Sequence, residues 1–434
     1  MNTPDNENNE YLYFLSCIYD IFDDENYIEN YETYRNRDID RKEGRVFIAL
    51  EKVTEKPNAS ETTFETREFL VSKIKGLNEG DFVYFEDDIL RNANNNIRAK
   101  GERFLNNRYR GKIIKKYKKD ITKDIKIKVK ELFSYHINVG HGNCSILVIK
   151  EQNKTEPLIW MVDCSIKDFT DKADKGTYLE NICCCINFIK DKHNICEFRL
   201  DKFFLTHTHY DHYSGIIELL NQDYIDNDTE IWINANYGHA SPYYNKINKR
   251  LLSLSQFIEP VEANSTNTIK IMHPKRTVVK SQASARNYVN PIVESKINNS
   301  SIVYKFNFKM QNNKTISILF PGDIETDGWD RMNNCEPYLD YSDYYCISHH
   351  GSITGHIRKL CPVNPSLLYN NLSFCARNAN RVILMGRDKA FKGIYSIKVI
   401  EDFQKKLLKS EKDINGLPCR FLEIDLINDK YYHI

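Results

Sequence analysis

A cluster of metal-binding side chains follows a short apolar run near the middle of the chain. The run Phe203-Phe204-Leu205 predicts a buried strand, and His207, His209, Asp211 and His212 come soon after it. Side chains alternate along an extended chain, so the first two histidines would point to the same side. The aspartate and the third histidine follow as the backbone turns. One imidazole pair and one carboxylate–imidazole pair could then face two adjacent metal ions.

These ligand types restrict the chemistry. Imidazole and carboxylate groups suit Zn²⁺, Mn²⁺ or Fe²⁺. Two such ions about 3.5–4 Å apart activate a bridging water for hydrolysis. We therefore predict a hydrolase that binds two divalent metal ions, Zn²⁺ or Mn²⁺.

The motif His-x-His-x-Asp-His is the signature of the metallo-β-lactamase fold, and the chain resembles this family. The resemblance implies that later segments supply the remaining residues of the site in chain order. Asp163 ends the apolar run 158–162, where the family has an aspartate that supports the histidine loop. Asp323 follows another apolar run and resembles the carboxylate that bridges the metals. One of His349 and His350 resembles the last ligand.

Four segments also resemble the ComEC-like branch of this family, a domain known from DNA-uptake proteins. They lie within residues 132–430 and comprise Val139–Ser145, Asn298–Val303, Gly322–Glu325 and His349–Ser352. This resemblance implies hydrolysis of phosphodiester bonds, with DNA or RNA as the substrate.

The resemblance assigns a role to each residue of the site. The implied ligands are His207 and His209 for one metal, Asp211, His212 and His350 for the other, and Asp323 between them. Asp163 would orient a histidine through its second ring nitrogen. Of the two adjacent histidines, we prefer His350 as the ligand, and His349 would then donate a proton to the leaving group. Ser352 would contact the phosphate or the transition state.

The chain departs from the family pattern at several positions. Many members place a further histidine ligand before the bridging aspartate, and the candidates here are His239 and His273. Neither follows a clear strand, so a loop histidine is the alternative interpretation of His239. His141 and Asn143 stand where glutamine and aspartate are common, and we expect both to line the pocket.

Residues 131–434 are expected to form an αββα sandwich, with the ligand loops gathered at one edge. The strands predicted for one sheet are 132–139, 145–149 and 158–162, and residues 201–205 lead into the histidine loop. Those predicted for the other sheet are 229–234, 301–308, 315–320 and 343–348. Helices are expected at 177–191 and from residue 215.

Residues 1–130 are expected to form a small β-rich accessory domain that could dock a protein partner. A helix is predicted at 10–22, and strands are predicted at 45–50, 68–71 and 81–85. Turn-rich segments separate these strands.

Residues 98–130 are rich in basic side chains with aromatic residues between them. Basic groups bind phosphates and aromatic rings stack on bases, so this segment could bind nucleic acid. The predicted contacts are Arg108, Arg110, Lys112, Lys115 and Lys116. A solvated, lysine-rich face or linker is the alternative. The chain has 61 Lys and Arg residues and 60 Asp and Glu residues, so its net charge is close to zero. Any attraction to nucleic acid must therefore come from a local basic patch.

The N-terminal residues lack the basic start and apolar segment of a signal peptide. No stretch approaches the roughly 18 apolar residues of a membrane span. The 12 cysteines include no Cys-x-x-Cys pair, which favours a reducing compartment. We therefore expect a cytoplasmic protein without membrane contact.

Together these features favour a metal-dependent nuclease, and the expected free-standing architecture suggests an effector of bacterial defence. One alternative is a hydrolase of small cyclic or lipid phosphodiesters. Another is a subunit whose activity is gated by a partner bound to residues 1–130. The dependence on salt concentration distinguishes the nuclease from the hydrolase of small phosphodiesters. Binding of a polymer weakens steeply as salt rises, whereas turnover of a small substrate does not.

Overall fold

The computed structural model describes most of the chain beyond residue 127 and part of the N-terminal region. The described residues are 12–20, 45–53, 64–74, 77, 81–86, 89–93, 128–166, 177–233, 242–251, 254, 257–260, 262–273, 297–325, 328–329, 342–356, 358–360, 368–370, 379–387 and 394–434.

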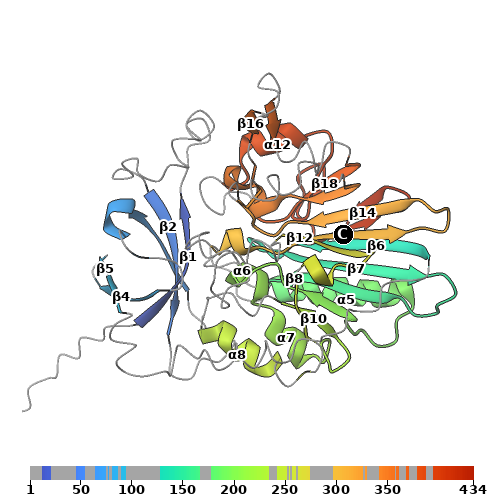
Figure 1. The fold of residues 1–434 in the computed structure, drawn as a ribbon, viewed down its shortest axis with the longest axis horizontal. Helices are drawn as coiled ribbons and strands as arrows, with labels where there is room; N and C mark the ends of the chain where they lie inside the picture. The colour runs from blue at the N-terminus through green and yellow to red at the C-terminus, as the bar shows by residue number, and fades with distance from the viewer. Residues whose placement is uncertain are drawn as a thin grey trace, which may run out of the picture.

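Two β-sheets lie at the centre of the molecule (Figure 1). Within the described residues, the first has eight strands in the order β11-β10-β9-β8-β7-β6-β20-β21. They are β6 (Val129–Ile137), β7 (Cys144–Glu151), β8 (Leu158–Cys164), β9 (Lys202–Phe204), β10 (Glu230–Trp232), β11 (Phe257–Ile258), β20 (Phe421–Asp425) and β21 (Lys430–His433). The second has six in the order β12-β13-β14-β15-β18-β19. They are β12 (Ile269–His273), β13 (Val303–Lys309), β14 (Thr315–Phe320), β15 (Tyr344–Cys346), β18 (Arg381–Leu384) and β19 (Leu407–Lys409).

Alternation of apolar side chains along β8 explains why these sheets stack. Trp160 and Val162 belong to the core between the two sheets, whereas Ile159 and Met161 belong to the core on the outer face. The Trp160 ring meets Phe306 of the second sheet edge-on, with 5.4 Å between ring centroids. Large rings from both sheets therefore fill the space between them.

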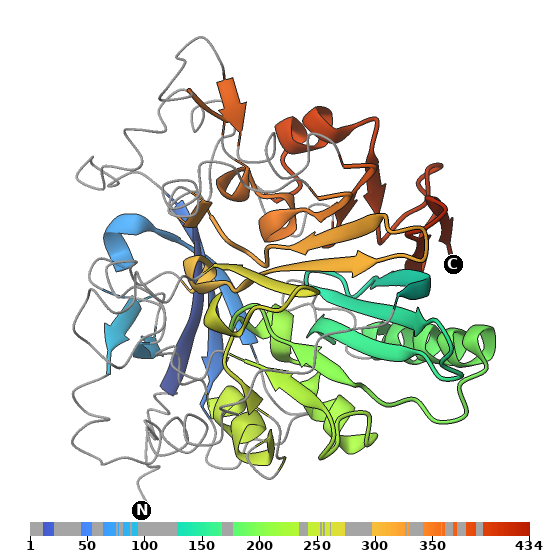
Figure 2. The same ribbon diagram turned by 45° about the vertical axis from the view of Figure 1, so that its right-hand side comes forward.

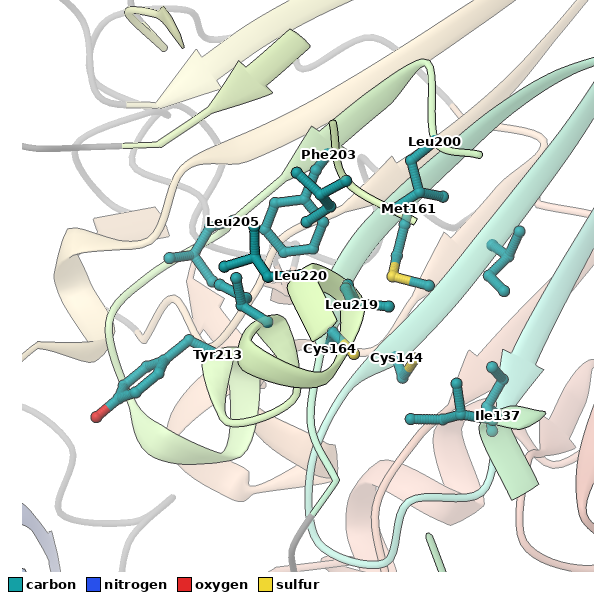
Figure 3. Packing of buried hydrophobic residues seen from close by; sticks show 14 of the residues in the cluster. Ile137, Cys144, Met161, Cys164, Leu200, Phe203, Leu205, Tyr213, Leu219 and Leu220 are labelled. Carbon is teal, nitrogen blue, oxygen red and sulfur yellow. The ribbon is translucent and has the colours of Figure 1, made fainter. Parts of the chain in front are cut away.

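Helices cover the outer faces of the two sheets. Those on the first sheet are α5 (Thr177–His193), α6 (Tyr210–Tyr213), α7 (Ile216–Asn221) and α8 (Pro242–Leu251). In Figure 3, Met161 and Phe203 of that sheet lie beside Leu219 and Leu220 of α7. Helix α12 (Ile397–Phe403) packs on the second sheet. The layers run helix, sheet, sheet, helix, so the prediction of an αββα sandwich is confirmed.

A separate antiparallel sheet lies in the N-terminal region, as Figure 2 also shows. Its order is β3-β2-β1-β4-β5, and the strands are β1 (Leu12–Asp20), β2 (Arg45–Lys52), β3 (Phe64–Leu70), β4 (Phe82–Glu86) and β5 (Ile89–Asn92). Leu15, Ile48 and Val83 share its core. The prediction of a β-rich N-terminal region is confirmed, and a domain boundary near residue 130 stays a prediction.

Two local predictions were wrong. Residues 12–20 form strand β1 rather than a helix, with Leu15 opposite Leu50 of β2, because a run rich in aromatic residues suits a pleated sheet. Strand β10 belongs to the first sheet and not the second, with Ile231 beside Phe203 in parallel register. The chain passes through α7 between these two strands, and a strand–helix–strand unit makes its strands parallel neighbours.

Among the described residues, the structure contains no helix with the length and apolar character needed to cross a membrane.

The first and second sheets approach each other closely where β14 ends. Gly322 has a φ of 59°, and a Cβ added there would lie 2.8 Å from Cβ of Thr206 and 2.9 Å from Oγ of Ser301. The Thr206 carbonyl in turn accepts a hydrogen bond from Ile302 N–H at 2.8 Å. Only glycine fits both the left-handed backbone and the narrow gap.

We expect Gly322→Ala to lower the free energy of unfolding by roughly 2–5 kcal/mol. A left-handed alanine costs about 1–2 kcal/mol, and overpacking adds about 1–3 kcal/mol. Urea denaturation followed by circular dichroism measures the loss. Gly416→Ala is the matched control, because its φ is 81° but nothing lies within 4 Å of an added Cβ. Equal losses in the two variants would contradict the close approach.

Candidate metal centre

The candidate site lies where several strands end at one edge of the sandwich. Strand β9 leads into His207 and His209, β14 leads into Asp323, and β15 leads into His350. Strands β8 and β9 are parallel neighbours, as are β14 and β15. Parallel neighbours end at the same edge of a sheet, so their loops meet there.

The structure brings six predicted metal ligands together in two groups that share one carboxylate. The larger group is Asp211, His212, Asp323 and His350, and the smaller group is His207, His209 and Asp323. Within each group, the potential ligand atoms lie within 4.8 Å of one another. Every one of these residues is buried.

Asp323 is at the centre of this arrangement. Its Oδ2 lies 3.2 Å from Nε2 of His212, 3.2 Å from Nε2 of His350 and 3.8 Å from Nε2 of His207. Asp211 Oδ2 lies 3.3 Å from Nε2 of His350. Three imidazoles therefore converge on one carboxylate.

The donor set fits a divalent cation. Oδ2 of Asp211 and of Asp323 lies 3.2–3.3 Å from imidazole nitrogens, but among the described residues none of these carboxylate oxygens, nor Nε2 of His212 or of His350, makes a hydrogen bond of good geometry. Buried polar atoms are normally hydrogen-bonded, and buried charges are normally paired or bound to metal. A divalent cation bound between these carboxylate oxygens and imidazole nitrogens would satisfy all of them.

The opposite ring nitrogens are held by the protein. Nδ1 of His212 donates to Oδ2 of Asp163 at 2.8 Å, and Nδ1 of His350 donates to the Met385 carbonyl at 3.2 Å. Asp163 also accepts hydrogen bonds from the backbone N–H and the hydroxyl of Thr206, each at 2.8 Å. Fixing one nitrogen in this way turns the other toward the cluster.

Backbone strain is concentrated at the site. Asp163 has a φ of 53°, and His349 and His350 each have a φ of 49°. Non-glycine residues rarely adopt this left-handed region, which costs about 1–2 kcal/mol per residue. Strain of this kind persists where the surrounding contacts fix a side chain for a task.

The strong mutual attraction of these groups alters their pKa values. Burial alone lowers the pKa of His350, but Asp323 and Asp211 outweigh it and raise the pKa to about 9. The pKa of His212 is likewise raised well above its ordinary value by Asp323 and Asp163, against the effect of burial. Without a cation, these attractions favour the protonated form of both imidazoles.

The two adjacent histidines have different surroundings. His350 lies in the metal-binding cluster, whereas Nδ1 of His349 pairs with the Thr354 hydroxyl at 2.8 Å and its Nε2 lies 3.3 Å from Nδ2 of Asn298. Glu325 Oε1 lies 3.5 Å from Nδ1 of His349. His349 thus belongs to a buried polar network beside the cluster.

Ser352 sits in the same network. Its hydroxyl lies 3.0 Å from that of Thr354 and accepts the Thr354 N–H at 3.3 Å, which caps the short helix η8 (Ile353–Gly355). Serine is a favoured N-cap residue, so this capping bond explains why a serine stands at the start of the helix.

Other predicted residues are placed as follows. His141 lies against the cluster, with Nε2 at 3.5 Å from Oδ2 of Asp211 and its ring centroid 4.3 Å from that of His350. Asn143 donates its backbone N–H to the Asp211 carbonyl at 3.0 Å. His273 pairs through Nδ1 with the Ser301 carbonyl at 2.8 Å and belongs to neither metal-binding group.

The remaining predicted residues lie outside the described part of the chain. They are His239, Arg108, Arg110, Lys112, Lys115 and Lys116.

Sequence reasoning gave no role to Asn299, Ser301 and Glu325, which the structure places around the site. The side chain of Asn299 accepts the N–H of Glu325 at 3.1 Å, and the Ser301 hydroxyl accepts the N–H of Asp323 at 3.1 Å. These bonds fix the turn that carries Asp323. The motif Asn298-Asn299-Ser300-Ser301 was the available signal, because consecutive polar residues before an apolar strand are suited to binding backbone groups.

Comparisons with known proteins give distant structural similarities. No protein-family model and no curated protein sequence matches the chain. A long form RNase Z from yeast is similar at 12% identity and a TM-score of 0.35, covering 71% of this chain and 43% of that chain. The metallo-beta-lactamase fold protein YhfI from Bacillus subtilis is similar at 10% identity and a TM-score of 0.31, covering 64% of this chain and 96% of that chain. The chain thus spans less than half the length of the yeast protein.

We expect metal binding at pH 7 to release about two protons, one each from His212 and His350, because a ligand imidazole must be neutral. Calorimetric titration of metal-free protein with Zn²⁺, in buffers with different heats of ionisation, measures the number. Release should decrease as the pH rises through about 9, where His350 loses its proton before the metal arrives. A binding heat that does not depend on the buffer at pH 7 would show that these imidazoles are already neutral.

Proposed function

We propose that this chain is a metal-dependent hydrolase of the metallo-β-lactamase type that cleaves phosphodiester bonds in DNA or RNA. One observation carries the proposal of a dinuclear site. Two groups of buried imidazole and carboxylate donors share the single carboxylate of Asp323. A carboxylate shared by two ligand sets is suited to a pair of divalent ions.

We assign His207 and His209 to one ion and His212, Asp211 and His350 to the other. Asp323 serves both. When bound there, two divalent ions such as Zn²⁺ or Mn²⁺ would supply Lewis acidity and lower the pKa of a shared water toward neutrality.

The protein's own residues then orient the groups and move protons. Asp163 fixes His212 through Nδ1, so that Nε2 stays directed at the cluster. We assign His349 as the proton donor for the leaving group, because it lies beside the cluster and Glu325 lies 3.5 Å from its Nδ1. Burial lowers the pKa of His349, and the negative charges of Asp323 and Glu325 oppose that effect. Asp211 completes the ligand set, and we assign Ser352 a contact with the phosphate.

The choice of a polymeric phosphodiester rests on the sequence. The ComEC-like motifs span most of the region beyond residue 131, and the basic segment 98–130 offers lysine and arginine for phosphate binding. A cytoplasmic location and a role in bacterial defence stay predictions.

We expect His209→Ala and Asp211→Ala each to reduce hydrolysis at least about 100-fold, since even the loss of a residue that merely supports a metal ligand costs 10–100-fold. Wild type and variants are incubated with single-stranded DNA, duplex DNA, RNA and bis(p-nitrophenyl) phosphate, each with Zn²⁺ or Mn²⁺. His193→Ala is the matched control, because this buried histidine bonds to Tyr135 outside the site.

The substrates separate the possible functions. If wild type and His193→Ala cleave a polymer and the two ligand variants do not, the protein is a nuclease. Cleavage of the small diester alone would favour a small-molecule phosphodiesterase. Unchanged turnover in both ligand variants would refute the proposed site. Metal binding without any hydrolysis would favour a partner-gated enzyme.

A further inference from the structure

Strand β2 of the N-terminal sheet has two buried faces. Ile48 and Leu50 belong to the core of its own sheet, whereas Ala49 belongs to the core beside the first sheet of the sandwich. Glu51 is 1% exposed and lies on the same side as Ala49, because side chains alternate along a strand. A carboxylate this deeply buried needs partners from the neighbouring structure.

Glu51 interacts with the start of helix α8. Its Oε1 accepts the backbone N–H of Tyr243 at 3.1 Å. Tyr243 is the second residue of the ten-residue helix Pro242–Leu251. N–H groups in a first helical turn have no partner within the helix, and a negative charge there is favourable. Glu51 therefore holds the first turn of α8 from outside.

The side chain of Tyr243 reaches from α8 to the metal-binding turn. Its hydroxyl donates to the Ser214 carbonyl at 2.9 Å, and Ser214 directly follows helix α6. Its ring lies 5.6 Å from the Tyr210 ring and stacks on the Tyr213 ring at 6.0 Å between centroids. Tyr243 thus touches both ends of α6, the helix that contains Asp211 and His212.

Helix α6 needs such support. It has only four residues, and the side chain of its N-cap residue His209 makes no capping hydrogen bond. Helices this short are unstable by themselves, so contacts with the rest of the protein must fix their position. Figures 1 and 2 both place the N-terminal sheet on the side of the sandwich where α8 lies, and Figure 1 shows α6 on that side as well.

We propose that the N-terminal sheet holds the metal-binding turn in place through Glu51 and Tyr243, which are positioning residues for Asp211 and His212. The inference rests on the proposed metal site and extends it. It gives the N-terminal region a role in setting metal affinity. The two residues act in series, since Glu51 orients Tyr243 and Tyr243 orients α6.

The test measures Co²⁺ binding to metal-free full-length protein by visible absorption. We expect Tyr243→Phe, which removes only the hydroxyl, to weaken affinity about 10-fold and to change the absorption bands of the bound ion. Groups that support metal ligands contribute about 10–100-fold to affinity, and Tyr243 acts at the lower end because it bonds to the backbone. Tyr344→Phe is the matched control. It loses a buried hydroxyl bond to the Leu426 carbonyl at 3.0 Å, at the start of β15 and six positions before His350.

A second pair of variants tests Glu51. Glu51→Gln keeps an acceptor for the Tyr243 N–H and should bind Co²⁺ within about twofold of wild type. Glu51→Ala loses the acceptor and should behave like Tyr243→Phe, and the double variant should be no weaker than either single variant. Circular dichroism verifies that each protein is folded.

The outcomes separate this inference from the proposed function. If wild type binds Co²⁺ and Tyr243→Phe and Glu51→Ala bind it equally well, the positioning role is wrong and the metal site stands. If wild type binds no Co²⁺, the proposed metal site is wrong and the positioning role falls with it. An equal loss of affinity in Tyr344→Phe would also overturn the inference, because the effect would then be general.

Discussion

The burial of the Asp323 carboxylate is the constraint on which the rest of the site depends. Its side chain is fully buried, and two imidazole nitrogens lie 3.2 Å from one of its oxygens. An uncompensated carboxylate in a protein interior costs several kcal/mol. The chain meets this cost by ending strands from both sheets at the same edge, where the imidazoles of His212 and His350 converge on Asp323. The sandwich therefore serves to bring together groups that are far apart in the sequence.

Local features of the site follow from this convergence. Asp163, His349 and His350 adopt left-handed backbone conformations, and each makes side-chain hydrogen bonds of 2.8 to 3.3 Å to neighbouring groups. Gly322 permits the closest approach, because a side chain there would collide with Thr206 and Ser301. Strain and tight packing are tolerated here because the dense hydrogen bonding around them offsets their cost.

The metal-binding turn, helix α6, depends on contacts from other parts of the chain for its position. Helix α6 contains two of the proposed ligands but has only four residues. Its position depends on a tyrosine from α8, and the first turn of α8 is held in turn by a glutamate from the N-terminal sheet. In this arrangement the N-terminal sheet contributes to the site through residues that lie between them.

The sequence by itself determined the types of donor and their order along the chain, because His-x-His-x-Asp-His is a local pattern and its spacing follows from strand and turn geometry. The resemblance of its motifs to the metallo-β-lactamase fold also indicated the αββα layers. The sequence did not predict that residues 12–20 form a strand or that residues 230–232 belong to the first sheet. A short apolar run does not specify its secondary structure or its partner strand. The tertiary structure agrees with the preference for His350, because it places His350 in the cluster and His349 in the polar network beside it. Only it joined Glu51 to Tyr243, 192 positions apart, because contacts over such separations arise from packing and leave no local pattern in the sequence.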